Sequence, residues 1–261
     1  MHVHLALCSV LTLGIAAPVA AQAANMWSYF TDAEKTSLVD TVRIEGKDPE
    51  PLIAGFSGLF PPDVPAIAAA AEAGLSSHFA DSGLCTDAVV AARPRPHPLM
   101  NDIRAGNMVR ARQISRAFLV DADVMACGDV SRASIVLLET ADGFLSVLPI
   151  PGGSETWLTL RQDLIGRVSL YMAVRLQEDC APEQMKETFR IENSDVAERA
   201  DLGPRIFGGY LTGRWTEQWQ ISACGHSFNF EMKLTADGKG GAYFSLTDLN
   251  DPARKNARPV E

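Results

Sequence analysis

The stretch RWTEQWQISACGHSFNFEMKLTADGKGGAYFSL, residues 214–246, decides the fold of this chain. Apolar and polar residues alternate along it, which is typical of an antiparallel strand with one buried face. A two-residue turn at Cys224-Gly225 places Trp219 opposite Phe230, and the same register makes one whole face of the hairpin apolar. A slip of one residue would destroy this match, so the pattern specifies the register.

A second, glycine-rich turn at residues 237–241 extends the pattern. It places Leu234 opposite Phe244 and Met232 opposite Leu246, so the apolar face continues onto a third strand. We predict a three-stranded antiparallel meander at the C-terminal end of the chain.

Glu217 interrupts the apolar face between Trp215 and Trp219. An unpaired buried carboxylate would cost several kcal/mol or would have to protonate. In one interpretation the three side chains form an exposed platform that binds a sugar or a cationic ligand. In the other, both indoles belong to the core and Glu217 pairs with an Arg of a covering element, as buried polar groups usually do.

The chain upstream of the meander alternates between helix and strand signals. We expect helices at residues 31–44 and 63–79, and three strands between 118 and 148. Leu160, Leu164 and Val168 begin an apolar stripe at helical spacing, so a long helix should follow. Either Thr159 and Gln162 form its capping box, or Ser154 is its plain N-cap. The expected class is α+β: a helical N-terminal part, then a mainly antiparallel sheet with one long covering helix and the C-terminal meander.

The first residues have the features of a secretory signal peptide. Residues 3–20 are almost wholly apolar, and Ala21-Gln22-Ala23 has the small-x-small form of a cleavage site. We therefore expect a signal peptide at 1–23, a helical region at 24–92, a proline-rich linker at 93–98, an α+β domain at 99–250 and a disordered tail at 251–261. No later run is long and apolar enough to span a bilayer.

Four cysteines follow the predicted cleavage site: Cys85, Cys127, Cys180 and Cys224. An even number of cysteines in an exported chain suggests two disulfides, for which three connectivities are possible. We favour Cys127–Cys180, because the helix between them should fold back onto its sheet, and this leaves Cys85–Cys224. No cysteine or histidine spacing predicts a zinc site.

A short pattern occurs twice in the chain. Ala126-Cys127-Gly128 and Ala223-Cys224-Gly225 each precede a strand that ends in Thr-Ala-Asp-Gly. Either the chain contains an internal duplication, or similar hairpin turns arose independently.

The chemistry that the composition excludes is clearer than the chemistry it indicates. The net charge of −9 argues against nucleic acid and anionic membranes as partners. We find no nucleotide-binding, metal-binding or nucleophile motif, and we expect no cofactor and no catalytic residue.

The sequence of the predicted C-terminal meander resembles the C-terminal region of a group of exported bacterial proteins with no established activity. The resemblance rests on Gly213-Arg-Trp-Thr-Glu-Gln-Trp, Ala-Cys-Gly and Thr-Ala-Asp-Gly-Lys-Gly-Gly. It implies a periplasmic or secreted protein. We expect a non-enzymatic binding or structural module with a protein or glycan partner in the envelope. The alternatives are a glycan or small-ligand binder, and a carboxylate-dependent hydrolase of envelope polymers that would use Glu217.

Overall fold

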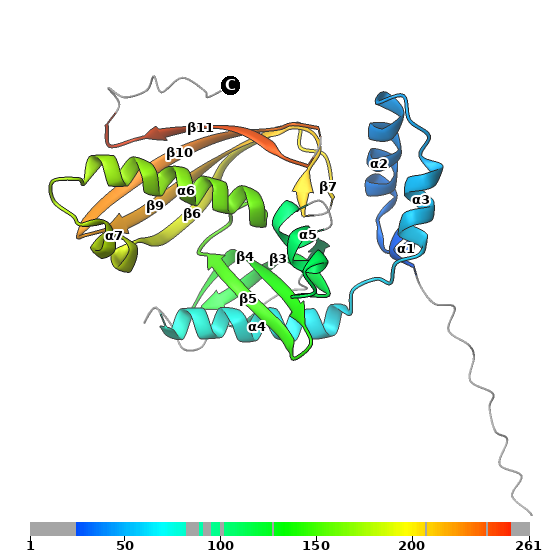
Figure 1. Ribbon diagram of the computed structural model, residues 1–261, viewed down its shortest axis with the longest axis horizontal. Coiled ribbons are helices and arrows are strands. Elements are labelled where there is room, and N and C mark those ends of the chain that lie inside the picture. Colours follow the sequence, from blue (N-terminus) through cyan, green and yellow to red (C-terminus); the bar gives the residue numbers. More distant parts are fainter. Residues whose placement is uncertain are drawn as a thin grey trace, which may run out of the picture.

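The computed structural model describes residues 25–81, 89–90, 95–99, 102–126, 128–206, 208–238 and 240–251 (Figure 1). The predicted α+β class is confirmed: N-terminal helices precede two antiparallel sheets, each covered by one long helix. The predicted signal peptide lies outside the described residues, as does the C-terminal tail beyond Asp251.

Three short helices form the N-terminal part: α1 (Met26–Tyr29), α2 (Asp32–Ile44) and α3 (Glu50–Ser57). A capping box begins α2, in which Thr31 accepts from the Glu34 N–H and the Glu34 carboxylate accepts from the Thr31 N–H. The Tyr29 hydroxyl donates to the Pro96 carbonyl over 2.7 Å, and Glu34 pairs with Arg95 over 2.7 Å. These contacts attach the helices to the first sheet.

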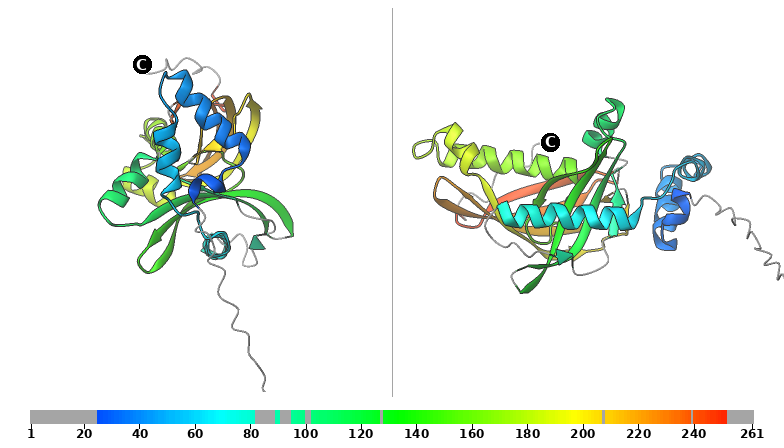
Figure 2. Two further views of the ribbon diagram at one scale, coloured as in Figure 1. Left: turned by 90° about the vertical axis from the view of Figure 1, so that its right-hand side faces the viewer. Right: turned by 90° about the horizontal axis from the view of Figure 1, so that it is seen from below.

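The first sheet, sheet A, contains five strands: β1 (Val89–Val90), β2 (Arg95–Pro98), β3 (Arg116–Ala126), β4 (Asp129–Thr140) and β5 (Gly143–Ile150). Helix α4 (Val64–Asp81) lies across one face (Figure 2). Ile67, Ala71 and Leu75 of α4 pack there against apolar side chains of β3 and β4.

The linker prediction is wrong for Arg95–Pro98, which is strand β2. The backbone explains how two prolines fit. The Leu99 N–H donates to the Ala117 carbonyl, so alternate residues before it, such as His97, also point their backbone groups toward β3. Pro96 and Pro98 therefore face away from β3, where a missing N–H breaks no ladder bond.

Asp102 begins two helices at once. Its Oδ1 accepts from the Ala105 N–H in α5 (Ile103–Arg110), over 2.9 Å. Its Oδ2 accepts from the Thr159 N–H in α6 (Leu158–Arg175), over 2.6 Å. The predicted Thr159–Gln162 capping box is therefore wrong: the cap of α6 comes from a residue far away in the sequence.

The second sheet, sheet B, has the order β11-β10-β9-β6. Its strands are β6 (Arg190–Ala200), β9 (Arg214–Ala223), β10 (His226–Ala236) and β11 (Ala242–Asp248). The predicted meander register is confirmed, with Trp219 opposite Phe230, Leu234 opposite Phe244 and Met232 opposite Leu246. Helix α6 covers the apolar face (Figure 1). Short helix α7 (Pro182–Thr188) precedes β6, and the small pair β7 (Arg205–Ile206) and β8 (Gly209–Tyr210) precedes β9.

The central hairpins of the two sheets have the same register, which either interpretation of the repeated pattern allows. The β3–β4 hairpin pairs Ala126 with Asp129, and the β9–β10 hairpin pairs Ala223 with His226 in the corresponding register. Phe118, Val120 and Ala122 face α4, and the equivalent Trp215, Glu217 and Trp219 lie on the face covered by α6.

Candidate functional site

Glu217 lies fully buried between the two sheets, and four groups donate hydrogen bonds to its carboxylate. Oε1 accepts from the Glu155 N–H (2.8 Å) and the Trp215 indole (3.0 Å). Oε2 accepts from the Ser154 hydroxyl (2.9 Å) and the Trp219 indole (2.7 Å). Every hydrogen bond to this carboxylate comes from β9 itself or from the segment that joins the sheets.

That segment, residues 151–157, is the connector between β5 and α6. Gly152 has φ +90°, and a Cβ there would lie 1.9 Å from the Ser194 carbonyl, so only glycine fits beside β6. The Gly153 N–H donates to the same carbonyl over 2.7 Å. The connector is therefore fixed against sheet B before it reaches Glu217.

Helix α6 contributes a cation to this site. Arg161 is buried and interacts electrostatically with Glu217. Burial lowers the pKa of Arg161 to about 10, so the guanidinium stays charged at neutral pH. Burial raises the pKa of Glu217, while the indole and hydroxyl donors and Arg161 oppose that rise.

A second buried carboxylate, Glu155, lies in the connector itself. Its Oε1 accepts from Arg199 of β6 (2.8 Å), and its Oε2 accepts from Arg205 and from the Tyr210 hydroxyl (2.8 Å). The Arg205 guanidinium also lies over the Tyr210 ring, 5.0 Å from its centroid. Glu155 of the connector and Glu217 of β9 thus both have their negative charge compensated by neighbouring hydrogen-bond donors and arginines.

Asp121 of β3 extends this polar network to sheet A. Its Oδ2 lies 3.6 Å from His97 Nε2 and 3.7 Å from Arg205 Nε, and its Oδ1 accepts from the Ser134 hydroxyl (2.8 Å). Ser, His and Asp therefore meet here, but Ser134 and His97 both contact the carboxylate. A nucleophile needs the histidine between the serine and the carboxylate, so this arrangement does not activate Ser134.

Trp215, Glu217 and Trp219 do not form the exposed platform that glycan binding requires. Their exposed fractions are 2%, 0% and 0%. The indoles donate to Glu217 and pack in the core, as the structural interpretation expected. The expected pairing with an Arg takes another form: the hydrogen-bond donors are the two indoles, the Ser154 hydroxyl and the Glu155 N–H, and Arg161 of the covering helix acts on Glu217 electrostatically. This arrangement positions the connector and the two sheets; it leaves no opening for a ligand at Glu217.

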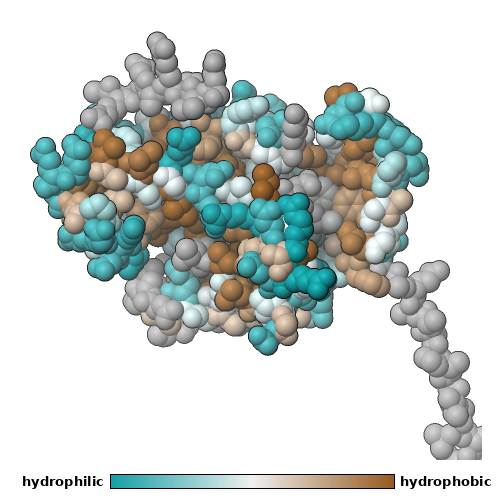
Figure 3. Space-filling view, in the orientation of Figure 1, coloured by the Kyte–Doolittle hydropathy of each residue, from teal (hydrophilic) through white to brown (hydrophobic). Residues whose placement is uncertain are grey.

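An apolar cavity of about 580 Å³ lies elsewhere, between the N-terminal helices, α5 and β3. Met26, Leu59 and Phe60 form the wall on the N-terminal side. Ala105, Gly106 and Val109 of α5, with Leu99 and residues 115–118, form the other walls. Leu59, Phe60 and Val109 remain 38%, 69% and 41% exposed at its rim. In the space-filling view, hydrophobic surface gathers on the N-terminal helices where they face the rest of the molecule (Figure 3).

The polar groups of the cavity wall are already paired. Arg116 donates from Nε and Nη2 to the two carboxylate oxygens of Glu139, over 2.5 and 2.8 Å. The Ser115 hydroxyl lies 2.9 Å from Glu139 Oε2. The Arg116 pKa is raised chiefly by Glu139, with a further contribution from Asp63. Among the described residues that line the cavity, the positive charge of Arg116 is therefore compensated.

Sequence reasoning missed this cavity. Its lining comes from five separate stretches of the chain, and no periodic pattern connects them. The local signals were the exposed Leu59-Phe60 before Pro61-Pro62, and the small pair Ala105-Gly106 inside a helix.

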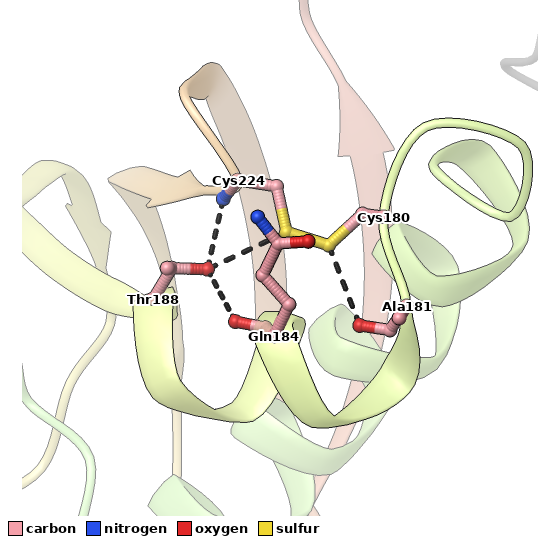
Figure 4. Close-up of a disulfide and its surroundings, with 5 residues drawn as sticks. All are labelled: Cys180, Ala181, Gln184, Thr188 and Cys224. Atoms are coloured by element: carbon pink, nitrogen blue, oxygen red, sulfur yellow. Dashed lines mark hydrogen bonds between the residues drawn. A yellow bond between two sulfur atoms is a disulfide. The ribbon is translucent and has the colours of Figure 1, made fainter.

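The cysteines pair differently from the connectivity that we favoured. Cys180 forms a disulfide with Cys224, with their Cα atoms 6.1 Å apart (Figure 4). The reason is α7, which brings the end of α6 to the β9–β10 turn. The Thr188 hydroxyl of α7 accepts from the Cys224 N–H over 2.9 Å and donates to the Gln184 carbonyl over 2.7 Å. Cys85 and Cys127 lie outside the described residues.

A disulfide is typical of proteins in oxidising compartments, so this bond is consistent with a location outside the cytoplasm. Within the described part of the chain, no helix combines the length and apolar character needed to cross a bilayer. Nor do three or more His, Cys, Asp or Glu side chains gather there as a candidate metal site.

Comparison with known proteins adds no relative from which a role could be transferred. No family model, no curated protein and no solved structure matches this chain.

Proposed function

We propose that the protein is an exported, non-enzymatic binding protein of the cell envelope, and that its ligand occupies the apolar cavity. The volume of about 580 Å³ carries this proposal. Sites for small molecules typically measure about 300–1,000 Å³ and are lined mainly by apolar side chains. The signal-peptide pattern at 1–23 and the Cys180–Cys224 disulfide support export.

The charges around the cavity favour a neutral, apolar ligand. Arg116 is the cation of the wall, and Glu139 and Asp63 compensate it. An anionic ligand would have to compete with Glu139 for Arg116, which already forms a bidentate ion pair. Burial of the anion without a partner would be costly. Trp215, Glu217 and Trp219 have no part in this proposal, because they are buried away from the cavity.

Gly106 offers a direct test of the cavity. A Cβ at this position meets nothing within 4 Å, and the residue lines the cavity, so Gly106→Phe should fill part of it without displacing backbone. Gly166 of α6 is the matched control, since a Cβ there also meets nothing within 4 Å and the residue is exposed. Both changes replace a helical glycine and should not destabilise the helix.

The measurement is the fluorescence of the neutral apolar probe N-phenyl-1-naphthylamine during titration with each protein. We expect saturable binding to the wild type and to Gly166→Phe, and binding at least about tenfold weaker to Gly106→Phe, because a phenyl ring and the probe cannot share one volume. Circular dichroism confirms that all three are folded. Equal affinities for the wild type and Gly106→Phe would overturn the proposal, as would absence of binding to the wild type.

Export has a separate test. Full-length protein produced in a bacterial host should appear in the periplasmic fraction or the medium with Ala24 as its first residue, by mass spectrometry. A cytoplasmic product that retains residues 1–23 would contradict export and leave the cavity proposal standing.

A further inference from the structure

The two edges of sheet B differ in how they are protected. Strand β6 carries two register shifts, at Ile191/Asn193 and Val196/Glu198, and five of its 11 residues are charged. Bulges and charges of this kind prevent a sheet from pairing with another strand. Strand β11 pairs with β10 in an unbroken register, and its only charged residue is Asp248, at its last position.

The outer side of β11 presents a regular row of backbone groups. The Leu249 N–H donates to the Asn229 carbonyl, which sets the alternation of the β10–β11 ladder. Ser245 therefore bonds toward β10, and the N–H and C=O groups of Phe244 and Leu246 point outward. Among the described residues, β10 is the only strand that pairs with β11.

The side chains at this edge are also incompletely covered. Met232 and Leu234 of β10 are 0% and 1% exposed. Their neighbours on the same face, Phe244 and Leu246 of β11, are only partly buried. A further strand beside β11 would cover both side chains and satisfy the outward backbone groups.

We propose that a second copy of this chain binds there, with the two β11 strands antiparallel about a two-fold axis at Ser245. This register uses all seven residues of the strand. It places Phe244 of one copy opposite Leu246 of the other, and Tyr243 opposite Thr247, so apolar residues meet on one face and polar residues on the other. Both α6 helices then lie on the same side of one continuous sheet.

The sequence of the edge favours a second copy over an unrelated strand. Asp248 meets Ala242 of the other copy, so no like charges are opposed, even though the chain carries a net charge of −9. The outward backbone groups belong to Ala242, Phe244, Leu246 and Asp248, which lie symmetrically about Ser245. A seven-residue edge buries less area than the roughly 1,600 Å² of a standard interface, so the dimer should depend on concentration.

Cysteine cross-linking tests both the dimer and its register. Ser245 is exposed and would face its own counterpart in a non-hydrogen-bonded pair, where Cα atoms lie about 4.5 Å apart, within the range for a disulfide. Ser245→Cys should form a covalent dimer under mild oxidation. Tyr243→Cys is the matched control: it is 73% exposed on the same face of β11 but would face Thr247, so it should not cross-link. Equal cross-linking of both variants, or of neither, would overturn the proposal.

The introduction of a charge at Ser245 gives a second test, which needs no covalent bond. Sedimentation should show reversible dimers of the wild type, weaker by about two- to fivefold in Ser245→Lys and in Ser245→Glu, because like charges would face each other at the axis. An equimolar mixture of the two variants should associate more tightly than either alone. A wild type that stays monomeric at high concentration would contradict the proposal, and so would a mixture that associates no better than its components.

Discussion

At the scale of single residues, Glu217 shows why a charged side chain can occupy the apolar face of a sheet. Its two oxygens accept four hydrogen bonds, two each, and these compensate the buried carboxylate for the water that it loses. The alternation of the strand was enough to single out Glu217 as the exception. Its partners in the connector could not be predicted, because Ser154 and Glu155 precede it by more than 60 residues in a segment without periodicity.

Replacement of Glu217 by Gln should destabilise the protein. The amide NH₂ would face two donors instead of accepting from them, and Arg161 would lose its negative neighbour. We expect the free energy of unfolding to fall by about 3 kcal/mol or more, measured by urea denaturation. Glu198→Gln, at an exposed position of β6, is the control and should change stability little. A loss of less than about 1 kcal/mol in Glu217→Gln would show that the four hydrogen bonds contribute little.

His97 should make stability depend on pH. Burial lowers its pKa below the ordinary 6.5, with Arg205 and Arg95 acting in the same direction and Asp121 opposing them. A histidine kept neutral in the folded protein takes up a proton on unfolding, so its contribution is present above about pH 6.5 and is lost as the pH falls. The loss is at most about 1.4 kcal/mol for each pH unit.

Urea denaturation at pH 7.5 and pH 5 measures this effect. His97→Gln should show a smaller loss of stability between the two values than the wild type. His226→Gln, at the exposed start of β10, should behave like the wild type. Asp121 does not interfere: burial would raise its pKa, but Arg205, His97 and Ser134 together hold it well below 3.8, so its contribution is lost only in stronger acid.

At the scale of elements, the sequence pattern predicted those strands and helices whose formation depends on residues close together in the chain. Alternation predicted the meander and its register, and an apolar stripe predicted α6. The patterns failed where the structure of an element depends on residues far away in the sequence. The start of α6 depends on Asp102, and proline-rich β2 becomes a strand only because β3 offers an edge on which its prolines can face outward. The disulfide depended on α7, a helix that the sequence reading did not include.

The Cys180–Cys224 bond should stabilise the link between α6 and the β9–β10 hairpin. It closes a loop with a sequence separation of 44, for which chain entropy suggests about 4 kcal/mol. Cys180→Ser, Cys224→Asn and the double variant should all lose a similar amount in guanidinium denaturation, because each breaks the same bond. Asn suits position 224, whose φ is +51°. Losses that add in the double variant would indicate that the thiols stabilise the protein through separate contacts.

At the scale of the whole molecule, the cavity could not have been predicted from the sequence. Its walls bring together α1, the end of α3, α5 and β3, whose arrangement follows from how the N-terminal helices dock. Phe30 and Phe56 of that part pack with Ile206 and Leu211, which lie more than a hundred residues later. The capping and apolar pattern predicted the helix at 31–44, but neither α1 and α3 nor the surface on which these helices dock.

Asp102 couples the two halves of the fold, and its replacement should show this. Asp102→Ala removes one cap from α5 and another from α6, so we expect a loss of about 2 kcal/mol, twice the typical value for one cap. Thr31→Ala removes the cap of α2 alone and should cost about half as much. Thermal denaturation compares the two, and equal losses would mean that Asp102 contributes through one helix only.

The shared cap has a consequence for how the molecule melts. A helix whose first turn is completed by a residue from the other half cannot stay fully formed once that half has unfolded. With Glu217 holding the connector from the opposite side, sheets A and B should lose their structure in one cooperative transition, even though each has its own covering helix. Calorimetry of the wild type should then give equal calorimetric and van't Hoff enthalpies, and Asp102→Ala should be the variant in which the two begin to separate.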